Sequence, residues 1–258
     1  MRFVDLSLTL KQPAPGEMHE KYAMQAPKID YFSHADTVQG VCEVFNCKPE
    51  DLPGGLGWSS ELVTLTTHSG THVDAPWHYY ITSEGKASRT IDEMPLEWFF
   101  SDGVVLDLRH KKPGEETTVE DIKAALEKIN YTIKPRDIVM MMYGMDKKHD
   151  EPSYWTDFPG MSAEATHWLI DQGVKVIGTD AFGFDIPFEK MRENYEKTGD
   201  RSKIWPAHRV GMEKEYCQIE KLANLDKLPP YGFKVACFPI SIYKASAGWA
   251  RVVAIIED

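Results

Sequence analysis

Short apolar runs, some alternating with polar residues and some continuous, predict a strand-rich chain. Residues 3–10 alternate, with Val4, Leu6 and Leu8 on one side, which is typical of an opening strand. Residues 11–60 hold many Pro and Gly and no strong periodicity, which favours long loops with short helices. Further strand candidates are residues 61–67, 104–108, 137–142, 174–179, 233–238 and 251–256.

Two helices are predicted between three of these strands. Apolar residues recur at helical spacing through residues 119–130, and Thr117 with Glu120 has the spacing of a capping box. Ser162 predicts the start of a second helix, which Gly173 ends. The order strand, helix, strand, helix, strand predicts a mixed, partly parallel sheet. We therefore expect an α/β fold, with the whole chain forming one compact domain.

Composition and charge exclude several classes of protein. The 258 residues carry 29 Lys and Arg against 40 Asp and Glu, a net charge of −11, which argues against a broad nucleic-acid or anionic-membrane surface. The first residues lack the apolar core of a signal peptide, and no window approaches the roughly 18 apolar residues of a membrane span. The four cysteines are scattered, which is typical of a reduced cytoplasmic protein, although a Cys42–Cys47 bridge remains an alternative.

The segment HSGTHVDAPWH, residues 68–78, carries the most informative pattern. It contains three of the nine histidines of the chain. His68, His72, Asp74 and His78 have the same parity. Alternate side chains share a face on an extended chain, so all four are able to point one way. The Gly, Thr and Pro within the segment argue against a helix.

This set of side chains indicates a metal site. Imidazole nitrogens and carboxylate oxygens suit Zn²⁺, Mn²⁺ and similar ions. Two His and one Asp on one face would form half of such a site, where a bound ion activates water, and a further His would serve proton transfer. The alternative is a polar strand face without a shared ligand. Structural zinc sites prefer closed, Cys-rich shells, so a His and carboxylate set with a surplus His favours catalysis.

The same segment resembles a known family. Residues 68–78 match the hallmark HxGTHxDxPxH of the cyclase and kynurenine formamidase-like metal-dependent hydrolases, which include arylformamidases and isatin hydrolases. Residues 177–181, IGTDA, look like the GxD segment that follows a central strand in that family. Residues 250–255, ARVVAI, look like its last strand. The resemblance implies a compact swivelling β/β/α unit and a homo-oligomer, either a dimer or a tetramer.

Carried over by position, the resemblance also assigns the site residues. His68, His72 and Asp74 would be metal ligands, and His208 and Glu220 would complete the site. One or two ions, zinc or manganese, would bind, with Asp74 or Glu220 as the bridge if there are two. His78 would be the general acid and base. These assignments for His208 and Glu220 rest on the resemblance alone.

The implied reaction is hydrolysis of a small amide, formamide, lactam or ester, including aromatic ones. Trp77, Asp180 and Phe182 are candidate substrate-binding residues, although each also fits a structural role, and Asp180 fits a turn or a helix cap equally well. The chain contains neither a GxSxG nucleophile elbow nor a phosphate-binding glycine motif. The competing hypothesis is a metal-containing small-molecule binding protein without turnover.

Overall fold

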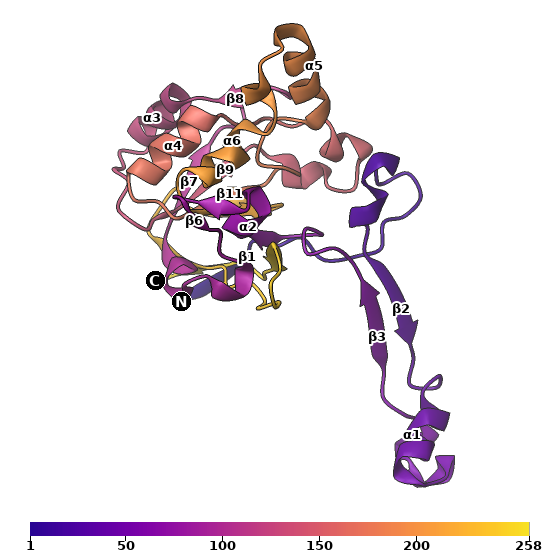
Figure 1. Ribbon diagram of the computed structural model, residues 1–258. Helices are drawn as coiled ribbons and strands as arrows, with labels where there is room; N and C mark the ends of the chain where they lie inside the picture. The colour runs from indigo at the N-terminus through magenta and orange to yellow at the C-terminus, as the bar shows by residue number, and fades with distance from the viewer. Residues whose placement is uncertain (258) are drawn as a thin grey trace.

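A mixed sheet forms the centre of the molecule in the computed structural model, which describes residues 1–257 (Figure 1). The sheet has nine strands within these residues, and β7, β9, β11 and β12 run parallel to their neighbours in that group while the outer pairs are antiparallel. In spatial order they are β1 (Arg2–Asp5), β15 (Val253–Ile256), β13 (Phe233–Ala236), β7 (Phe100–Asp107), β9 (Ile138–Met142), β11 (Val176–Thr179), β12 (Cys217–Glu220), β4 (His72–Asp74) and β14 (Ala247–Trp249).

The predicted strand, helix, strand, helix, strand unit is confirmed. Strands β7, β9 and β11 are parallel, and α3 (Val119–Lys128) and α4 (Ala163–Asp171) connect them. Ser162 caps α4 as expected, since its hydroxyl accepts the Ala165 N–H at 3.1 Å. The predicted cap of α3 was one residue early: Thr118 and Asp121 form the capping box. The Thr117 hydroxyl is instead bonded to the Tyr143 hydroxyl at 2.7 Å.

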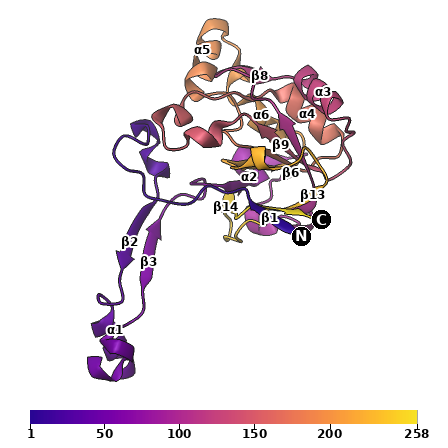
Figure 2. The ribbon, with the colours of Figure 1, turned by 180° about the vertical axis from the view of Figure 1, so that it is seen from behind.

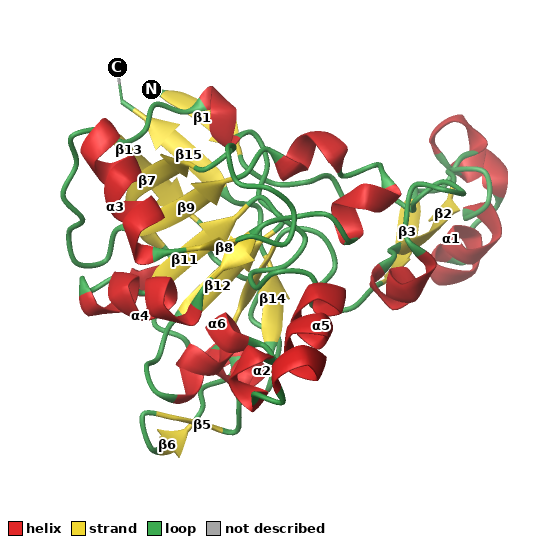
Figure 3. Cartoon of the chain, turned by 90° about the horizontal axis from the view of Figure 1, so that it is seen from above, coloured by secondary structure: helices red, strands yellow, loops and turns green. Residues whose placement is uncertain are grey.

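Both faces of the sheet are covered, because successive residues of its central strands point to opposite sides. On one face Leu106, Val139 and Ile177 pack with α3 and α4. On the other face Val105 and Met140 join a second apolar cluster with the antiparallel strands. Figure 3 shows α3 and α4 lying beside the parallel strands.

An arm projects from this body, formed by residues that the sequence predicted as long loops with short helices up to residue 60 and as a strand over residues 61–67. It is the hairpin of β2 (Lys28–Phe32) and β3 (Ser60–Thr64), with α1 (Val38–Phe45) at its tip. Figures 1 and 2 both show it extending away from the sheet. Five of its large apolar side chains are more than half exposed: Tyr31, Val44, Phe45, Trp58 and Leu62.

Apart from α5 (Phe188–Thr198), which has 11 residues, the remaining elements are short. They are β5 (Thr82–Ser83), β6 (Lys86–Ala87), β8 (Glu116–Thr117), β10 (Gly160–Met161), α2 (Pro76–Tyr79), α6 (Pro206–Arg209) and the 3₁₀ helix η1 (Glu20–Gln25), besides several other 3₁₀ turns. No helix within residues 1–257 is long and apolar enough to cross a membrane. The four cysteines are free, so Cys42 and Cys47 are not bridged.

Candidate metal centre and active site

Strands β4 and β12 bring three ligand candidates onto one face of the sheet. His72 lies directly opposite Glu220 in the antiparallel register. Asp74 follows His72 by two residues and therefore points to the same side. The His72 Nε2 atom lies 3.2 Å from Asp74 Oδ1 and 3.6 Å from Glu220 Oε2. Sheet pairing thus brings His72 and Asp74 to Glu220, which follows them by 148 and 146 positions in the sequence.

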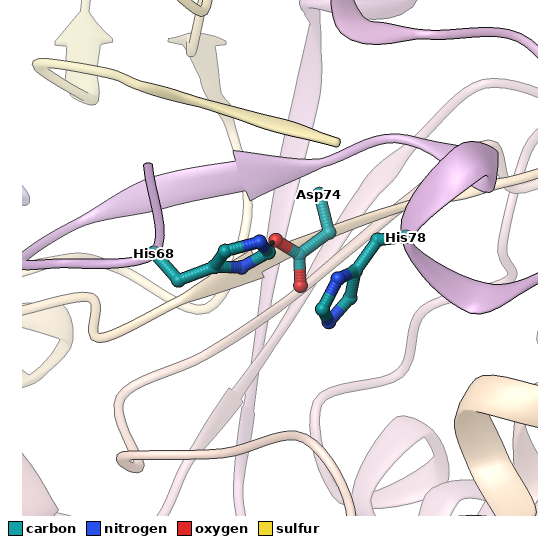
Figure 4. A group of neighbouring side chains, drawn as sticks. All are labelled: His68, Asp74 and His78. Carbon is teal, nitrogen blue, oxygen red and sulfur yellow. Dashed lines mark ion pairs between the residues drawn. The ribbon is translucent and has the colours of Figure 1, made fainter. Parts of the chain in front are cut away.

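His68 and His78 reach the same place from outside the strand. The extended geometry expected for residues 68–78 holds only over His72–Asp74, since α2 begins at Pro76. His78 is therefore carried by a helical turn. His68 Nδ1 lies 2.9 Å from Asp74 Oδ1, and the ring centroids of His68 and His78 are 4.1 Å apart. Figure 4 shows the Asp74 carboxylate between these two imidazoles.

Gly70 allows the sharp turn between His68 and His72. Its φ of 61° is in the left-handed region, which an L side chain rarely adopts. A Cβ atom at this position would also collide with the Leu10 side chain. The His72 Nδ1–H donates to the Gly70 carbonyl at 2.8 Å. This bond leaves the Nε2 lone pair of His72 free to face Asp74 and Glu220.

His208 completes the cluster from α6. Asp185 accepts a hydrogen bond from the His208 Nδ1–H, and its carboxylate also accepts the Ala207 and His208 backbone N–H groups, at 2.6 and 3.2 Å. The His208 Nε2 atom is thereby turned toward Glu220 Oε1, 3.9 Å away. No feature of the local sequence around Asp185 indicated this orienting role.

The buried charges shift one another's proton affinity. Burial alone would raise the pKa of Asp74, but the neighbouring His68, His72 and His78 hold it well below its usual range. Burial lowers the pKa of His78 to about 3, and the Asp74 carboxylate offsets this only in part. The His78 imidazole is therefore neutral near pH 7.

The donor atoms fit a divalent cation. His72 Nε2 and both Asp74 carboxylate oxygens are buried and make no hydrogen bond, which is costly unless another group satisfies them. Their close contacts are with one another and, for Asp74 Oδ1, with His68 Nδ1 at 2.9 Å. Two groups of three candidate ligands within residues 1–257 have their donor atoms within 4.8 Å of one another, and both contain Asp74. One group is His68, Asp74 and His78, and the other is His72, Asp74 and Glu220. His208 lies outside both groups.

A cavity of about 390 Å³ opens beside this cluster. Its volume is at the lower end of the range for small-molecule sites. His68, His78 and Glu220 form its polar end. Further polar residues of the lining are Lys21, Gln25, Thr66, Asp185 and His208. The aromatic and aliphatic side chains of the wall are Tyr22, Met24, Phe158, Phe182, Phe184, Ile186, Phe188, Met191 and Trp205.

The three residues proposed from the sequence for substrate binding lie in different surroundings. Phe182 lines the cavity, and its ring centroid is 4.8 Å from that of Tyr22. Trp77 is 43% exposed and lies outside the set of residues that line the cavity. The buried Asp180 carboxylate accepts the backbone N–H groups of Tyr143 and Gly144, at 2.9 and 2.7 Å, and also does not line the cavity.

Comparison with known proteins decides the family. Residues 4–186 match the family model described as "Putative cyclase". The chain belongs to this cyclase family. The matched region contains the HxGTHxDxPxH segment but ends before His208 and Glu220, which the fold brings to the same cluster.

Individual relatives agree with the cyclase family. Over 191 residues the chain is 31% identical to a kynurenine formamidase of Erythrobacter litoralis, covering 74% of each protein. Over 204 residues it is 24% identical to an isatin hydrolase of Roseibium aggregatum, covering 75% of this chain and 73% of that one. A crystal structure of an isatin hydrolase bound to the product analogue thioisatinate has the same fold, with a TM-score of 0.75, 21% identity and coverage of 99% of this chain and 92% of that chain.

Proposed function

We propose that this cyclase-family chain is a metal-dependent hydrolase that cleaves the C–N bond of a small amide, formamide or lactam. One observation carries the proposal: His72 Nε2 and both Asp74 oxygens are buried without hydrogen bonds, in contact with His68 and Glu220, which line a cavity suited to a small molecule. Relatives named kynurenine formamidase and isatin hydrolase support this reaction class. A small ester is a further candidate substrate, because the same attack of water on a carbonyl carbon would cleave it.

The proposed ligands are His68, His72, Asp74, His208 and Glu220. A bound zinc or manganese ion would polarise the substrate carbonyl and activate water. The protein orients the donor atoms beforehand, through the Gly70 carbonyl on His72 and the Asp185 carboxylate on His208. One ion, or two with Asp74 between them, is consistent with the two groups of ligands.

His78 is the proposed general acid and base. Its imidazole is neutral near pH 7, borders the cavity and lies beside His68 and Asp74. It accepts a proton from the attacking water and returns it to the leaving amide nitrogen.

An aromatic substrate fits the proposed function best. Phe182 and Tyr22 meet edge-on, and Trp205 stacks on His208 with ring centroids 4.3 Å apart. These rings present faces and edges against which a planar substrate ring packs favourably. Trp77 and Asp180 do not line the cavity, so neither would contact this substrate directly.

The test is metal-reconstituted turnover on a panel of substrates. Metal-stripped protein is loaded with zinc or manganese and assayed on aryl formamides, lactams and aryl esters. We expect hydrolysis of one class that a chelator abolishes and added metal restores. Tight metal and ligand binding without turnover on any class would instead support a binding protein.

We also propose that a second copy of the chain covers the arm. An isolated two-stranded hairpin is marginally stable in water, and the exposed apolar side chains of this arm would be buried by a homo-oligomer. Val44 and Tyr31 are each 71% exposed, so V44E and Y31E remove few contacts within the chain. Light scattering should show these variants as smaller species than wild type. The control L96E, at a 67% exposed position on the body, should keep the wild-type mass.

The location proposed for this enzyme is the cytoplasm. Cys42, Cys47, Cys217 and Cys237 are free, and unpaired cysteines are typical of reducing compartments. Small molecules are its proposed partners beyond the second copy of the chain.

A further inference from the structure

Lys221, which directly follows Glu220, is a buried lysine that the proposed mechanism does not use. Its side chain is only 3% exposed, whereas lysines are almost never buried without a partner. Its φ of 61° places it in the left-handed region, which is unfavourable for a residue with a side chain. Both features are destabilising unless specific contacts compensate for them.

The ammonium group joins three segments that surround the cavity. Lys221 Nζ donates to the His68 carbonyl at 2.7 Å and to Gln25 Oε1 at 3.2 Å. It also lies over the ring of Phe182, 4.7 Å from the centroid. His68 is a proposed ligand, Gln25 ends η1, and Gln25 and Phe182 both line the cavity.

The backbone of Lys221 fixes the same region from the other side. Its carbonyl accepts the Thr71 hydroxyl at 2.5 Å, and the Thr71 oxygen accepts the Leu8 N–H at 2.8 Å. Its N–H donates to the Ala181 carbonyl at 3.1 Å. The turn that carries His68 is therefore held at the His68 carbonyl and at Thr71 by one residue.

We propose that Lys221 is a positioning residue that fixes the His68 turn and η1 against Glu220, and thereby sets both the ligand geometry and the substrate-side wall of the cavity. This inference rests on the proposed hydrolase function. The hydrogen bond to Gln25 fixes the position of η1 in the cavity wall. The hydrogen bond to the His68 carbonyl fixes the position of the proposed ligand His68. The two links are separable because they end on different segments.

The experiment compares K221M, Q25A and the double variant with a matched control. Lys175 is a suitable control position because its Nζ also donates to a backbone carbonyl, that of Glu215 at 3.2 Å, and also lies over an aromatic ring, that of Trp98 at 5.1 Å. The variant K175M therefore removes similar contacts elsewhere. The readouts are amide hydrogen exchange of the metal-free proteins and their affinity for zinc, together with kcat and KM for formanilide when loaded with zinc.

Each link has its own expected result. K221M and Q25A should both speed amide exchange in residues 20–26 by at least about tenfold relative to K175M, since each breaks the link to η1. K221M alone should also speed exchange at residues 66–71 and weaken zinc binding about tenfold, within the range typical of lost ligand orientation. Q25A should raise KM for formanilide with kcat unchanged, and K221M should lower kcat as well.

Two results would overturn the proposal. One is exchange in K221M at residues 20–26 and 66–71 that equals exchange in K175M. The other is full additivity of K221M and Q25A in the exchange of residues 20–26, because one link cannot be broken twice. If K221M does not fold, Q25A decides the question by its exchange and KM. Wild type that binds zinc but hydrolyses no amide would count against the proposed function, and the exchange data would still test the role of Lys221.

Discussion

At the scale of single residues, the central feature is a carboxylate with unsatisfied lone pairs among imidazoles. Asp74 is fully buried, makes no hydrogen bond and lies among the imidazoles of His68, His72 and His78. His72 and His208 each use one ring nitrogen to donate to an orienting acceptor and present the other nitrogen to the cluster. Within residues 1–257 His78 has no such acceptor, and its neighbouring rings are those of His68, Tyr79, Trp205 and His208. This difference separates the proposed proton carrier from the oriented ligands.

Replacing His78 should abolish turnover without releasing the metal. We expect H78A to lower kcat by about 100-fold or more, as is typical when a general acid–base group is lost. Metal content by elemental analysis should equal that of wild type. H167A is the control, since His167 pairs with the exposed Glu213 and does not line the cavity. A loss of metal in H78A would show that His78 is a ligand, as its place in one group of candidate ligands allows.

Asp180 should make stability depend on pH. Burial raises the pKa of Asp180 to about 7, against about 3.8 in an unfolded chain, and its backbone hydrogen bonds offset this only in part. Between these values the folded state binds the proton more tightly, so ionisation at higher pH favours unfolding. The free energy of unfolding of wild type should fall relative to D180N from about pH 4 to pH 7, by up to about 1.4 kcal/mol per pH unit. Denaturant titrations across this range measure it, and parallel curves for the two proteins would refute it.

At the scale of elements, the site depends on a short strand between two turns. Strand β4 pairs with β12 on one side and β14 on the other, so His72 and Asp74 are fixed by two ladders. His68 precedes the strand and depends on the turn at Gly70. His78 follows it and depends on α2.

Substituting Gly70 should therefore disturb His68 specifically. G70A combines an unfavourable φ of 61° with a collision against Leu10, whereas G85A has an unfavourable φ of 74° and no atom within 4 Å of the new Cβ. The difference between the two variants isolates the collision. We expect thermal unfolding of G70A to show at least about 1 kcal/mol more destabilisation than G85A, and zinc binding to weaken only in G70A. Equal behaviour of the two variants would contradict the role of this turn.

Local sequence patterns predicted which helices and strands form better than they predicted the residues at which these begin and end. The parallel unit from β7 to β11 follows from apolar runs and helix caps, which are short-range signals. The cap at Thr118 was missed by one residue because Thr117 and Thr118 both precede an acid at the required spacing. In the arm, β2 fell in a stretch interpreted as loops because much of this strand is exposed and lacks the alternation that burial imposes. By contrast, β3 overlaps the strand predicted at residues 61–67.

The site was predictable where its residues are consecutive. Residues 68–78 carry their chemistry in one segment, so their spacing alone indicated a metal site. His208 and Glu220 were assigned by resemblance, and the structure places them beside His72 and Asp74. Asp185, Ser246 and Lys221 contact the cluster across 23, 178 and 153 positions, and no local pattern marks such pairs.

At the scale of the whole molecule, metal binding and folding should be linked. The proposed ligands come from β4, β12, α6 and the turn before β4, which meet only in the folded chain. Zinc at about 100 times its dissociation constant should stabilise the fold by about 2.7 kcal/mol, provided that the unfolded chain does not bind it. Thermal unfolding with zinc and then with a chelator measures this. D74N should show little response to either, and a D74N response equal to wild type would place the ion elsewhere.

The carboxylate shared by the two groups of ligands has a consequence for stoichiometry. If two ions bind, His68 and Asp74 would hold one, and His72, Asp74 and Glu220 would hold the other, so both would draw on the Asp74 carboxylate. Occupancy of one position would then alter the affinity of the other, and thermodynamic reciprocity would make the effect equal in both directions. A calorimetric titration of the metal-free protein should accordingly deviate from the curve of independent, identical positions. Binding of the first ion would then change the affinity for the second, so the two binding events would not be independent.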